Sequence, residues 1–256
     1  MSENVTFHDL SGQSVFITGG GSGIGAALTD GFLTQGCKVA FVQRSDASKF
    51  VVKMRRKHGV TPLFIKCDIT DVAALQHAMA QVASAHGNIT IVVNNAANDV
   101  RHSLGNITSD NWDLGQAVNL KPHVFTAQAV VAGMKEAGGG AIINFSSVSY
   151  MMGNDGYPGY VAAKAGITGL TRGLARELGP NNIRVNALMP GWVLTQKQKD
   201  MWATPDALTA HLERQCLKKH LVENDIVDAT LFLASKASRM MTGQALVVDG
   251  GVVMTG

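Results

Sequence analysis

Seven short runs of apolar residues recur along the chain, separated by longer stretches in which apolar residues follow helical spacing. The runs are largely apolar, whereas a strand with one face in water would alternate apolar and polar positions. Because strands of a parallel sheet are covered on both faces, this pattern predicts buried parallel strands. The predicted strands are residues 14–18, 38–43, 61–67, 89–95, 140–147, 182–189 and 245–250.

The stretches between these runs have the apolar spacing of amphipathic helices. Asp68 and Thr70 precede one of them and are candidate helix caps. Strands that alternate with helices predict an α/β fold: a doubly wound Rossmann-type domain with a central seven-stranded parallel sheet. No linker or repeat interrupts the series, so a single domain over residues 1–256 is expected. The predicted helices are residues 23–35, 70–86, 122–137, 157–178 and 223–235.

Composition and charge exclude several classes of protein. The 256 residues are 46% hydrophobic, which suits a full core, and no apolar run is long enough to span a membrane. The N-terminus does not resemble a secretory signal. A net charge of +3 is too small to indicate nucleic-acid binding, and the histidines lack metal-site spacing, so no metal is expected. Cys37, Cys67 and Cys216 have no CxxC spacing, which favours free thiols in a reducing compartment, the cytoplasm.

The first predicted strand runs directly into the glycine-rich sequence GGGSGIGAAL. Gly19, Gly23 and Gly25 allow a tight turn, close approach of the backbone to a ligand and close packing of the next helix. The start of that helix offers free N–H groups and the positive end of a dipole. A glycine-rich turn alone is also typical of a flexible loop, but its position between strand and helix favours binding of a nucleotide pyrophosphate.

The end of the second predicted strand is where a dinucleotide-binding fold contacts the adenosine ribose. An acidic residue there binds the 2′-hydroxyl of NAD, and a basic one accommodates the 2′-phosphate of NADP. The strand ends Val42-Gln43-Arg44-Ser45, without a carboxylate. The guanidinium of Arg44 can form a forked contact with phosphate, which favours NADP slightly. Asp46 could serve NAD instead, so both cofactors remain open.

Three motifs occur in order, namely Thr18-Gly19-x-x-x-Gly23-Ile24-Gly25, Asn94-Asn95-Ala96 and Tyr160-x-x-x-Lys164. With this set, nearly the whole chain resembles the short-chain dehydrogenases/reductases. The resemblance implies an NAD(P)-dependent oxidoreductase that acts on CH–OH groups and forms a homotetramer.

Two positions depart from the pattern of this family. Ala97 replaces a common glycine, and Ser22 replaces the arginine of many NADP-dependent relatives, which weakens the argument from Arg44. The resemblance also implies which residues contact the cofactor. They are Gly19, Ser22, Gly23, Ile24, Gly25, Arg44, Asp68, Ile69, Asn95, Ala96, Tyr160, Lys164, Pro190, Gly191, Val193 and Thr195.

Tyr160 and Lys164 lie four positions apart, so on a helix they share one face. The other nearby tyrosine, Tyr157, has no lysine four positions on. An unperturbed tyrosine has a pKa of about 10. A neighbouring ammonium is expected to lower this pKa toward the working range of a general base.

The resemblance assigns a role to each member of a catalytic set. It implies that Tyr160 is the general base and that Ser147 forms a hydrogen bond with the substrate oxygen. By chemistry alone, Ser146 is an alternative to Ser147. It assigns Lys164 to the nicotinamide ribose as well, and Asn119 to a water that passes the proton outward.

Residues 94–104, 145–153 and 202–226 resemble segments of bacterial aldose 1-dehydrogenases. Such enzymes oxidise the C1 hydroxyl of a sugar ring to a lactone, so the resemblance implies a small sugar substrate. The segment from about 191 to 222 lacks strand patterns and is expected to cover the site as a lid. Polar and aromatic side chains suit a sugar, although each could equally organise its own loop. The candidate substrate contacts are Ser147, Ser149, Asn154, Tyr160, Trp192, Asn98 and His102.

Two other functions fit the same sequence. The first is a dehydrogenase or reductase of a polyol, 3-oxoacyl or steroid-like substrate, because the catalytic set specifies hydride transfer and nothing narrower. The second is an NAD(P)-sensing protein without turnover. Family relatives of that kind usually lose a catalytic residue, whereas Ser147, Tyr160 and Lys164 are all present here. An enzyme is therefore the favoured class.

Overall fold

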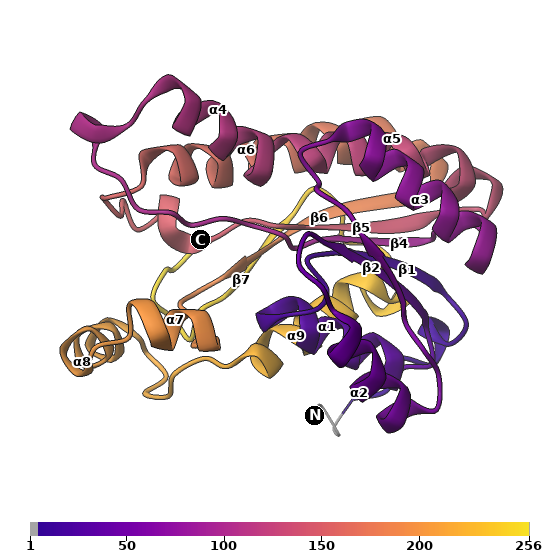
Figure 1. The fold of residues 1–256 in the computed structure, drawn as a ribbon, viewed down its shortest axis with the longest axis horizontal. Coiled ribbons are helices and arrows are strands. Elements are labelled where there is room, and N and C mark those ends of the chain that lie inside the picture. The colour runs from indigo at the N-terminus through magenta and orange to yellow at the C-terminus, as the bar shows by residue number, and fades with distance from the viewer. Residues whose placement is uncertain (1–4, 256) are drawn as a thin grey trace.

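A seven-stranded parallel sheet forms the centre of the molecule, for which a computed structural model describes residues 5–255 (Figure 1). The strands are β1 Ser14–Thr18, β2 Lys38–Gln43, β3 Leu63–Lys66, β4 Ile91–Asn94, β5 Gly140–Phe145, β6 Ile183–Pro190 and β7 Ala245–Val248. Their order in the sheet is β3-β2-β1-β4-β5-β6-β7. The order reverses between β1 and β4, as in a doubly wound fold. The predicted fold class and all seven predicted strands are confirmed.

Helices cover both faces of this sheet (Figure 1). They are α1 Gly23–Thr34, α2 Ser48–His58, α3 Val72–His86, α4 Ser109–Asn119, α5 Lys121–Glu136, α6 Pro158–Leu178, α7 Gln196–Met201, α8 Pro205–Arg214 and α9 Glu223–Ala234. Short 3-10 helices are η1 His8–Leu10, η2 Leu104–Asn106, η3 Val148–Tyr150, η4 Gly179–Asn181 and η5 Lys236–Ser238. One face carries α1, α2 and α9, and the other carries α3, α5 and α6, with α4 packed on α5 and α6. Within residues 5–255, none of the helices combines the length and the apolar character that crossing a membrane requires.

Helix α2 and the start of α3 differ from the sequence prediction, and α4, α7 and α8 were not predicted either. The apolar pattern does not predict α2, because this helix is rich in Lys and Arg and buries only Met54. At the start of α3 the N-cap is Asp71, whose side chain accepts a hydrogen bond from the backbone N–H of Ala74 at 3.0 Å. The predicted caps, Asp68 and Thr70, bond to each other instead, with Thr70 donating to Asp68 Oδ1. That cap prediction is therefore wrong.

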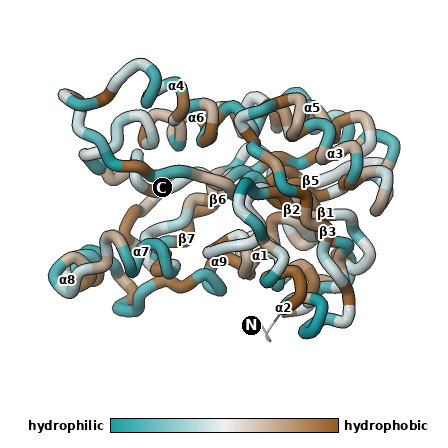
Figure 2. Tube along the Cα trace, in the orientation of Figure 1, coloured by the Kyte–Doolittle hydropathy of each residue, from teal (hydrophilic) through white to brown (hydrophobic). Residues whose placement is uncertain are grey.

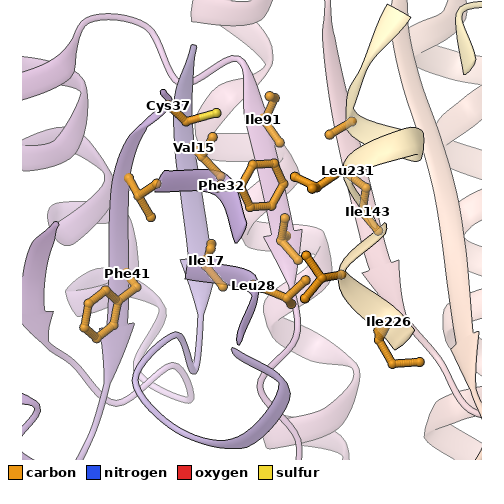
Figure 3. Packing of buried hydrophobic residues seen from close by; sticks show 14 of the residues in the cluster. Val15, Ile17, Leu28, Phe32, Cys37, Phe41, Ile91, Ile143, Ile226 and Leu231 are labelled. Atoms are coloured by element: carbon orange, nitrogen blue, oxygen red, sulfur yellow. The ribbon is translucent and has the colours of Figure 1, made fainter. Parts of the chain in front are cut away.

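The sheet buries side chains in two layers, one on each face. Along β1, Val15 and Ile17 belong to one layer and Phe16 to the other, because successive strand side chains point to opposite faces. Figure 3 shows the first layer, where these two residues lie with Leu28 and Phe32 of α1. Hydrophobic residues are concentrated along the strands, and hydrophilic ones on the outer helices and loops (Figure 2). Burial on both faces explains the continuous apolar runs.

The fold brings two loops together at the point where the strand order reverses. Thr18 at the end of β1 pairs with Asn94 at the end of β4, so the loops that follow these strands are neighbours. In open α/β sheets, ligands bind in the crevice at this point. After β6, residues 191–222 leave the sheet and form α7 and α8, which lie outside the two helix layers (Figure 1). A β-bridge between Val193 and Leu221 joins the two ends of this segment.

Candidate active site

The turn between β1 and α1 allows the backbone to come close to a ligand. Gly19 and Gly23 have φ angles of 71° and 49°, which residues with a side chain rarely adopt. A Cβ on Gly25 would lie 1.9 Å from the carbonyl oxygen of Gly19, so α1 can pack this closely only with glycine. Ser22, the N-cap of α1, makes no side-chain cap hydrogen bond, which leaves the N–H groups of the first turn for another acceptor. The turn therefore fits a pyrophosphate.

Side-chain hydrogen bonds fix this turn to the loop after β4. Thr18 Oγ1 accepts from the backbone N–H groups of Asn95 and Ala96, both at 3.0 Å. The amide of Asn95 donates back to the carbonyl oxygens of Thr18 at 3.0 Å and Gly19 at 3.3 Å. The Thr-Gly and Asn-Asn-Ala motifs are therefore one structural unit.

The ends of β2 and β3 carry the residues expected near the adenosine. Arg44 Nη1 lies 4.0 Å from Asp68 Oδ2, and its side chain is 73% exposed, so it is free to turn toward a phosphate. Asp46, the alternative for NAD, is occupied at the start of α2, where Ser48 donates to its carboxylate. Gln43, which sequence reasoning missed, accepts a hydrogen bond from Gly21 N–H at 2.9 Å and links β2 to the glycine turn.

A cavity of about 540 Å³ opens beside the glycine turn, between the ends of the central strands and the segment 191–222. The predicted site residues that line it are Ile24, Asn95, Ser147, Ser149, Asn154, Tyr160, Lys164, Pro190, Gly191, Trp192, Val193 and Thr195. Gly19, Ser22, Gly23, Gly25, Ala96, Arg44, Asp68, Ile69, Asn98, His102 and Asn119 lie outside its lining. About half of the expected cofactor and substrate contacts therefore line one cavity, and this half includes Ser147, Tyr160 and Lys164.

Lys164 is almost completely buried, with 1% of its surface exposed. Its Nζ donates to the carbonyl oxygen of Phe145 at 2.7 Å, and its own carbonyl accepts from Ser146 Oγ at 2.7 Å. Burial lowers the pKa of Lys164 to about 7, although the carboxylate of Asp99 opposes this shift. The amine is therefore poised to gain or lose its proton near neutral pH.

This shifted pKa predicts how stability depends on pH. Between a pKa of about 7 in the folded chain and the ordinary value of 10.5, the unfolded chain binds a proton that the folded chain does not. Stability therefore rises with pH across this window. We expect the free energy of unfolding of the wild type, minus that of Lys164→Met, to increase across the window when both are measured by urea denaturation. A constant or falling difference would contradict the burial of this amine.

Ser146 and Ser147 have different surroundings. Ser146 Oγ is buried and already donates to Lys164, whereas Ser147 caps the turn η3, with its Oγ accepting from Ser149 N–H at 3.1 Å. The hydroxyl proton of Ser147 is thus free to be donated to a neighbouring oxygen, and a hydrogen bond with Ser147 acts to lower the pKa of Tyr160 against the larger effect of burial. The geometry favours Ser147 over Ser146 as partner of the reacting oxygen.

The pKa of Tyr160 differs from the sequence expectation. Burial raises this pKa most, the carboxylate of Asp99 raises it further, and the hydrogen bond with Ser147 lowers it. Lys164 Nζ lies 5.4 Å from the centre of the Tyr160 ring and donates to Phe145. The lysine therefore does not overcome burial, and the predicted lowering of the tyrosine pKa is wrong for the protein alone.

Three residues expected near the reaction, Asn98, His102 and Asn119, lie outside the cavity lining. The side chain of Asn119, 1% exposed, accepts from Asn98 N–H at 2.8 Å and donates to the Asn98 carbonyl at 2.9 Å. Asn98 thus contacts Asn119 through its backbone rather than its side chain. His102 donates its backbone N–H to the Gly156 carbonyl at 2.7 Å. Neither Asn98 nor His102 lines the cavity, and both fix the loop after β4 through backbone hydrogen bonds.

The remaining candidate substrate contacts form a polar and aromatic wall. Asn154 donates to the hydroxyl of Tyr157 at 3.1 Å, and the Tyr157 ring lies 5.3 Å from that of Tyr160. Trp192 donates from its indole N–H to Gln198 at 2.9 Å. Ser149 Oγ is buried and has no hydrogen-bond partner within residues 5–255.

Sequence reasoning missed several charged residues of the cavity wall, among them Asp99 and Arg101. Asp99 accepts from Lys197 at 2.5 Å and from Gln198 at 2.9 Å, which ties the loop after β4 to α7. Burial raises the pKa of Asp99, but Lys197 outweighs it and the net shift is downward, so the carboxylate stays ionised. Its partners lie about a hundred positions along the chain, so no local pattern could have found this contact.

Comparisons with known proteins identify the family to which the chain belongs. The chain matches the family model described as "Enoyl-(Acyl carrier protein) reductase" over residues 19–253. The "Probable galactose dehydrogenase GalD" of Rhizobium meliloti (strain 1021) is 45% identical, over 96% of this chain and 97% of that protein. The "D-xylose 1-dehydrogenase" of Caulobacter vibrioides (strain NA1000 / CB15N) is 41% identical, over 96% and 97%. A crystal structure from Sinorhizobium meliloti 1021, described as a short-chain alcohol dehydrogenase, has a TM-score of 0.91 at 31% identity, over 96% of this chain and 98% of that one.

These matches cover nearly the whole chain rather than one motif. The glycine turn, the Asn-Asn-Ala loop and the tyrosine-lysine pair all occur in order within the matched region. The chain therefore belongs to the short-chain dehydrogenase/reductase family of oxidoreductases.

Proposed function

We propose that this enzyme oxidises the C1 hydroxyl of an aldose sugar to a lactone, with NAD or NADP as the acceptor. The observation that carries the proposal is that Ser147, Tyr160 and Lys164 line a cavity whose wall also includes Asn154 and Trp192. Hydrogen-bonding groups beside a flat aromatic face suit a sugar ring. Relatives described as galactose dehydrogenase and D-xylose 1-dehydrogenase support the sugar class.

In the proposed reaction, Tyr160 removes the proton of the C1 hydroxyl while the C1–H bond breaks and the carbonyl of the lactone forms. The hydroxyl of Ser147 holds the reacting oxygen. Lys164 is fixed in place by its hydrogen bond to Phe145 at 2.7 Å and is positioned to bind the nicotinamide ribose. When bound, an oxidised nicotinamide accepts the hydride from C1, and its positive charge favours the phenolate of Tyr160.

Asn119 contributes to proton release through its backbone in this proposal. Its side chain is fully engaged by Asn98, so a water that carries the proton outward has to bind elsewhere. The helix breaks at Leu120, between α4 and α5, and carbonyl groups at a helix end lack intrahelical partners. The Asn119 carbonyl is therefore the proposed acceptor for that water.

The nucleotide lies along the glycine turn in this proposal, with its phosphates at the start of α1. We favour NADP slightly over NAD, because Arg44 is exposed at the end of β2 and Asp46 is occupied by Ser48. Ser22 offers no positive charge for the 2′-phosphate, which keeps the preference small.

We further propose that residues 191–222 are a lid over the substrate. Trp192, Gln198 and Trp202 line the cavity from this segment, and the Val193–Leu221 bridge joins its two ends. The hydrogen bonds from Lys197 and Gln198 to Asp99 hold it against the loop after β4.

The direct test is absorbance of the reduced nicotinamide, with purified protein, a panel of aldoses, and NAD and NADP in parallel. We expect rapid reduction with a pentose or hexose, and turnover with NADP at least equal to that with NAD. Nucleotide binding without reduction by any aldose would overturn the sugar proposal.

A polyol or 3-oxoacyl substrate is the second candidate, and one observation favours it. The cavity wall also includes apolar Phe145, Val148 and Met152, which suit an acyl chain. Turnover of such substrates, together with inactivity toward every aldose, would support this candidate. Nucleotide binding with no turnover of any alcohol or carbonyl compound would instead support an NAD(P)-sensing protein without catalytic activity.

We propose a homotetramer in the cytoplasm. Helix α4 and the turn before it expose apolar side chains, with Leu104 81%, Trp112 42% and Leu114 54% exposed, and such a face suits a subunit interface. The three cysteines are free thiols, which fits a reducing compartment. Light scattering that gives a monomer would contradict the assembly.

A further inference from the structure

Arg101, on the loop after β4, is held against two aromatic rings at the cavity wall. Its guanidinium carbon lies 4.0 Å from the centre of the Tyr157 ring and 4.9 Å from that of Trp202. Tyr157 is the N-cap of α6, and Trp202 is the C-cap of α7 in the proposed lid. Contact between a guanidinium face and an aromatic ring is favourable and fixes the plane of the guanidinium.

The N–H groups of this guanidinium have no protein partner within residues 5–255. The only carboxylate of the cavity wall, Asp99, lies two positions away, but it is held by Lys197 and Gln198. The ion pairs of the described chain do not include Arg101. An arginine whose faces lie on aromatic rings directs its donors sideways, in the plane of the fork.

The position of Arg101 relates it to the reaction. The ring of Tyr157, which Arg101 contacts, lies 5.3 Å from the ring of Tyr160, and the charge of Arg101 acts to lower the pKa of Tyr160. A sugar whose C1 oxygen meets Tyr160 therefore has its far side within reach of the Arg101 fork.

We propose that Arg101 is a substrate-binding residue that donates a forked pair of hydrogen bonds to two adjacent hydroxyl oxygens of the aldose, on the side of the ring remote from C1. The inference rests on the proposed sugar oxidation and adds the group that orients the ring. Two parallel N–H donors match two neighbouring oxygens, and hydrogen bonds from a charged donor are stronger than neutral ones. Because Trp202 packs on the same guanidinium, a sugar bound there also favours the docked position of α7.

The test compares wild type, Arg101→Lys and Arg101→Gln on the best aldose and on its monodeoxy derivatives. Lysine keeps the charge but not the fork, so we expect both variants to lose about ten- to hundredfold in kcat/KM on the parent sugar, mainly through KM. On the deoxy sugar that lacks a contacted hydroxyl, wild type should lose a similar factor and the variants little more. Arg176→Gln, an exposed arginine on the last turn of α6, is the control and should match wild type.

Three other outcomes of this experiment would each contradict part of the proposal. An equal loss by the variants on every sugar, deoxy sugars included, overturns the forked contact and leaves Arg101 a packing residue. A wild-type preference for the corresponding hexuronate that Arg101→Gln abolishes overturns the hydroxyl pair in favour of a carboxylate. Failure of the wild type to oxidise any aldose overturns the proposed function and this inference together, so the two failures are distinguishable.

Discussion

Replacement of Tyr160 by phenylalanine is expected to lower the turnover of the best sugar by about a hundredfold to ten-thousandfold, the range that a positioned general base contributes. The variant keeps the ring that lies against Tyr157 at 5.3 Å but removes the hydroxyl that would take the proton. Since packing is retained, nucleotide affinity and melting temperature should change little. The loss should therefore fall on kcat rather than on binding.

Tyr150→Phe is the matched control for this experiment. Tyr150 lies outside the cavity lining, and its hydroxyl contacts Thr168 at 3.2 Å. We expect this variant to retain wild-type turnover. Near-normal turnover of Tyr160→Phe, measured with both nucleotides, would exclude Tyr160 as the base and would direct attention to its neighbour Tyr157.

The second large effect is expected at Gly25, where alanine should abolish measurable nucleotide binding and destabilise the fold. The new Cβ would lie 1.9 Å from the Gly19 carbonyl oxygen and 2.7 Å from the Asn95 amide nitrogen, so the glycine turn has to move. Overpacking of this kind costs about 1–3 kcal/mol. That cost exceeds the gain of about 1 kcal/mol that alanine brings to a helix. Nucleotide titration by fluorescence and thermal unfolding measure the two effects.

Gly169→Ala in α6 separates the steric cause from helix propensity. A Cβ at Gly169 meets no atom within 4 Å, so alanine should keep or raise the melting temperature and leave nucleotide binding intact. If Gly25→Ala bound nucleotide as tightly as Gly169→Ala, the close packing of α1 on the turn would not matter for the cofactor.

Much of the fold was predictable from sequence, because burial of the sheet on both faces requires strands that are visible in the sequence as apolar runs. β1 and β2 have their predicted bounds, since the central positions of these buried parallel strands are apolar. Helix α2 was not predictable in the same way. It buries only Met54, and most of its other side chains are charged or polar, so it lacks a clear apolar pattern. The N-cap Asp71 shows a further limit: Asp68, Thr70 and Asp71 all have cap chemistry, and only backbone geometry selects one of them.

The candidate site was predictable where its residues belong to ordered local motifs. The glycine turn, Asn95, Ser147, Tyr160 and Lys164 were identified, and the structure brings the last four to one cavity. The features that could not be predicted depend on which residues the tertiary structure brings together. The raised pKa of Tyr160 follows from burial and from Asp99.

The contacts of the proposed lid depend on tertiary distance as well. Arg101 meets Trp202, and Asp99 meets Lys197, across about a hundred residues of chain. Asn98 and His102 had the right chemistry for a sugar, but they do not line the cavity. Sequence thus identifies the reacting groups more readily than the groups that orient the substrate.

The most direct test of the central claim uses an aldose that carries deuterium at C1. The reduced nicotinamide produced by the wild type is analysed by mass spectrometry, and the sugar product by NMR. We predict one deuterium in the reduced nicotinamide and a lactone as the product, because the hydride comes from C1. Reduced nicotinamide without deuterium, or a product oxidised at another carbon, would contradict C1 oxidation.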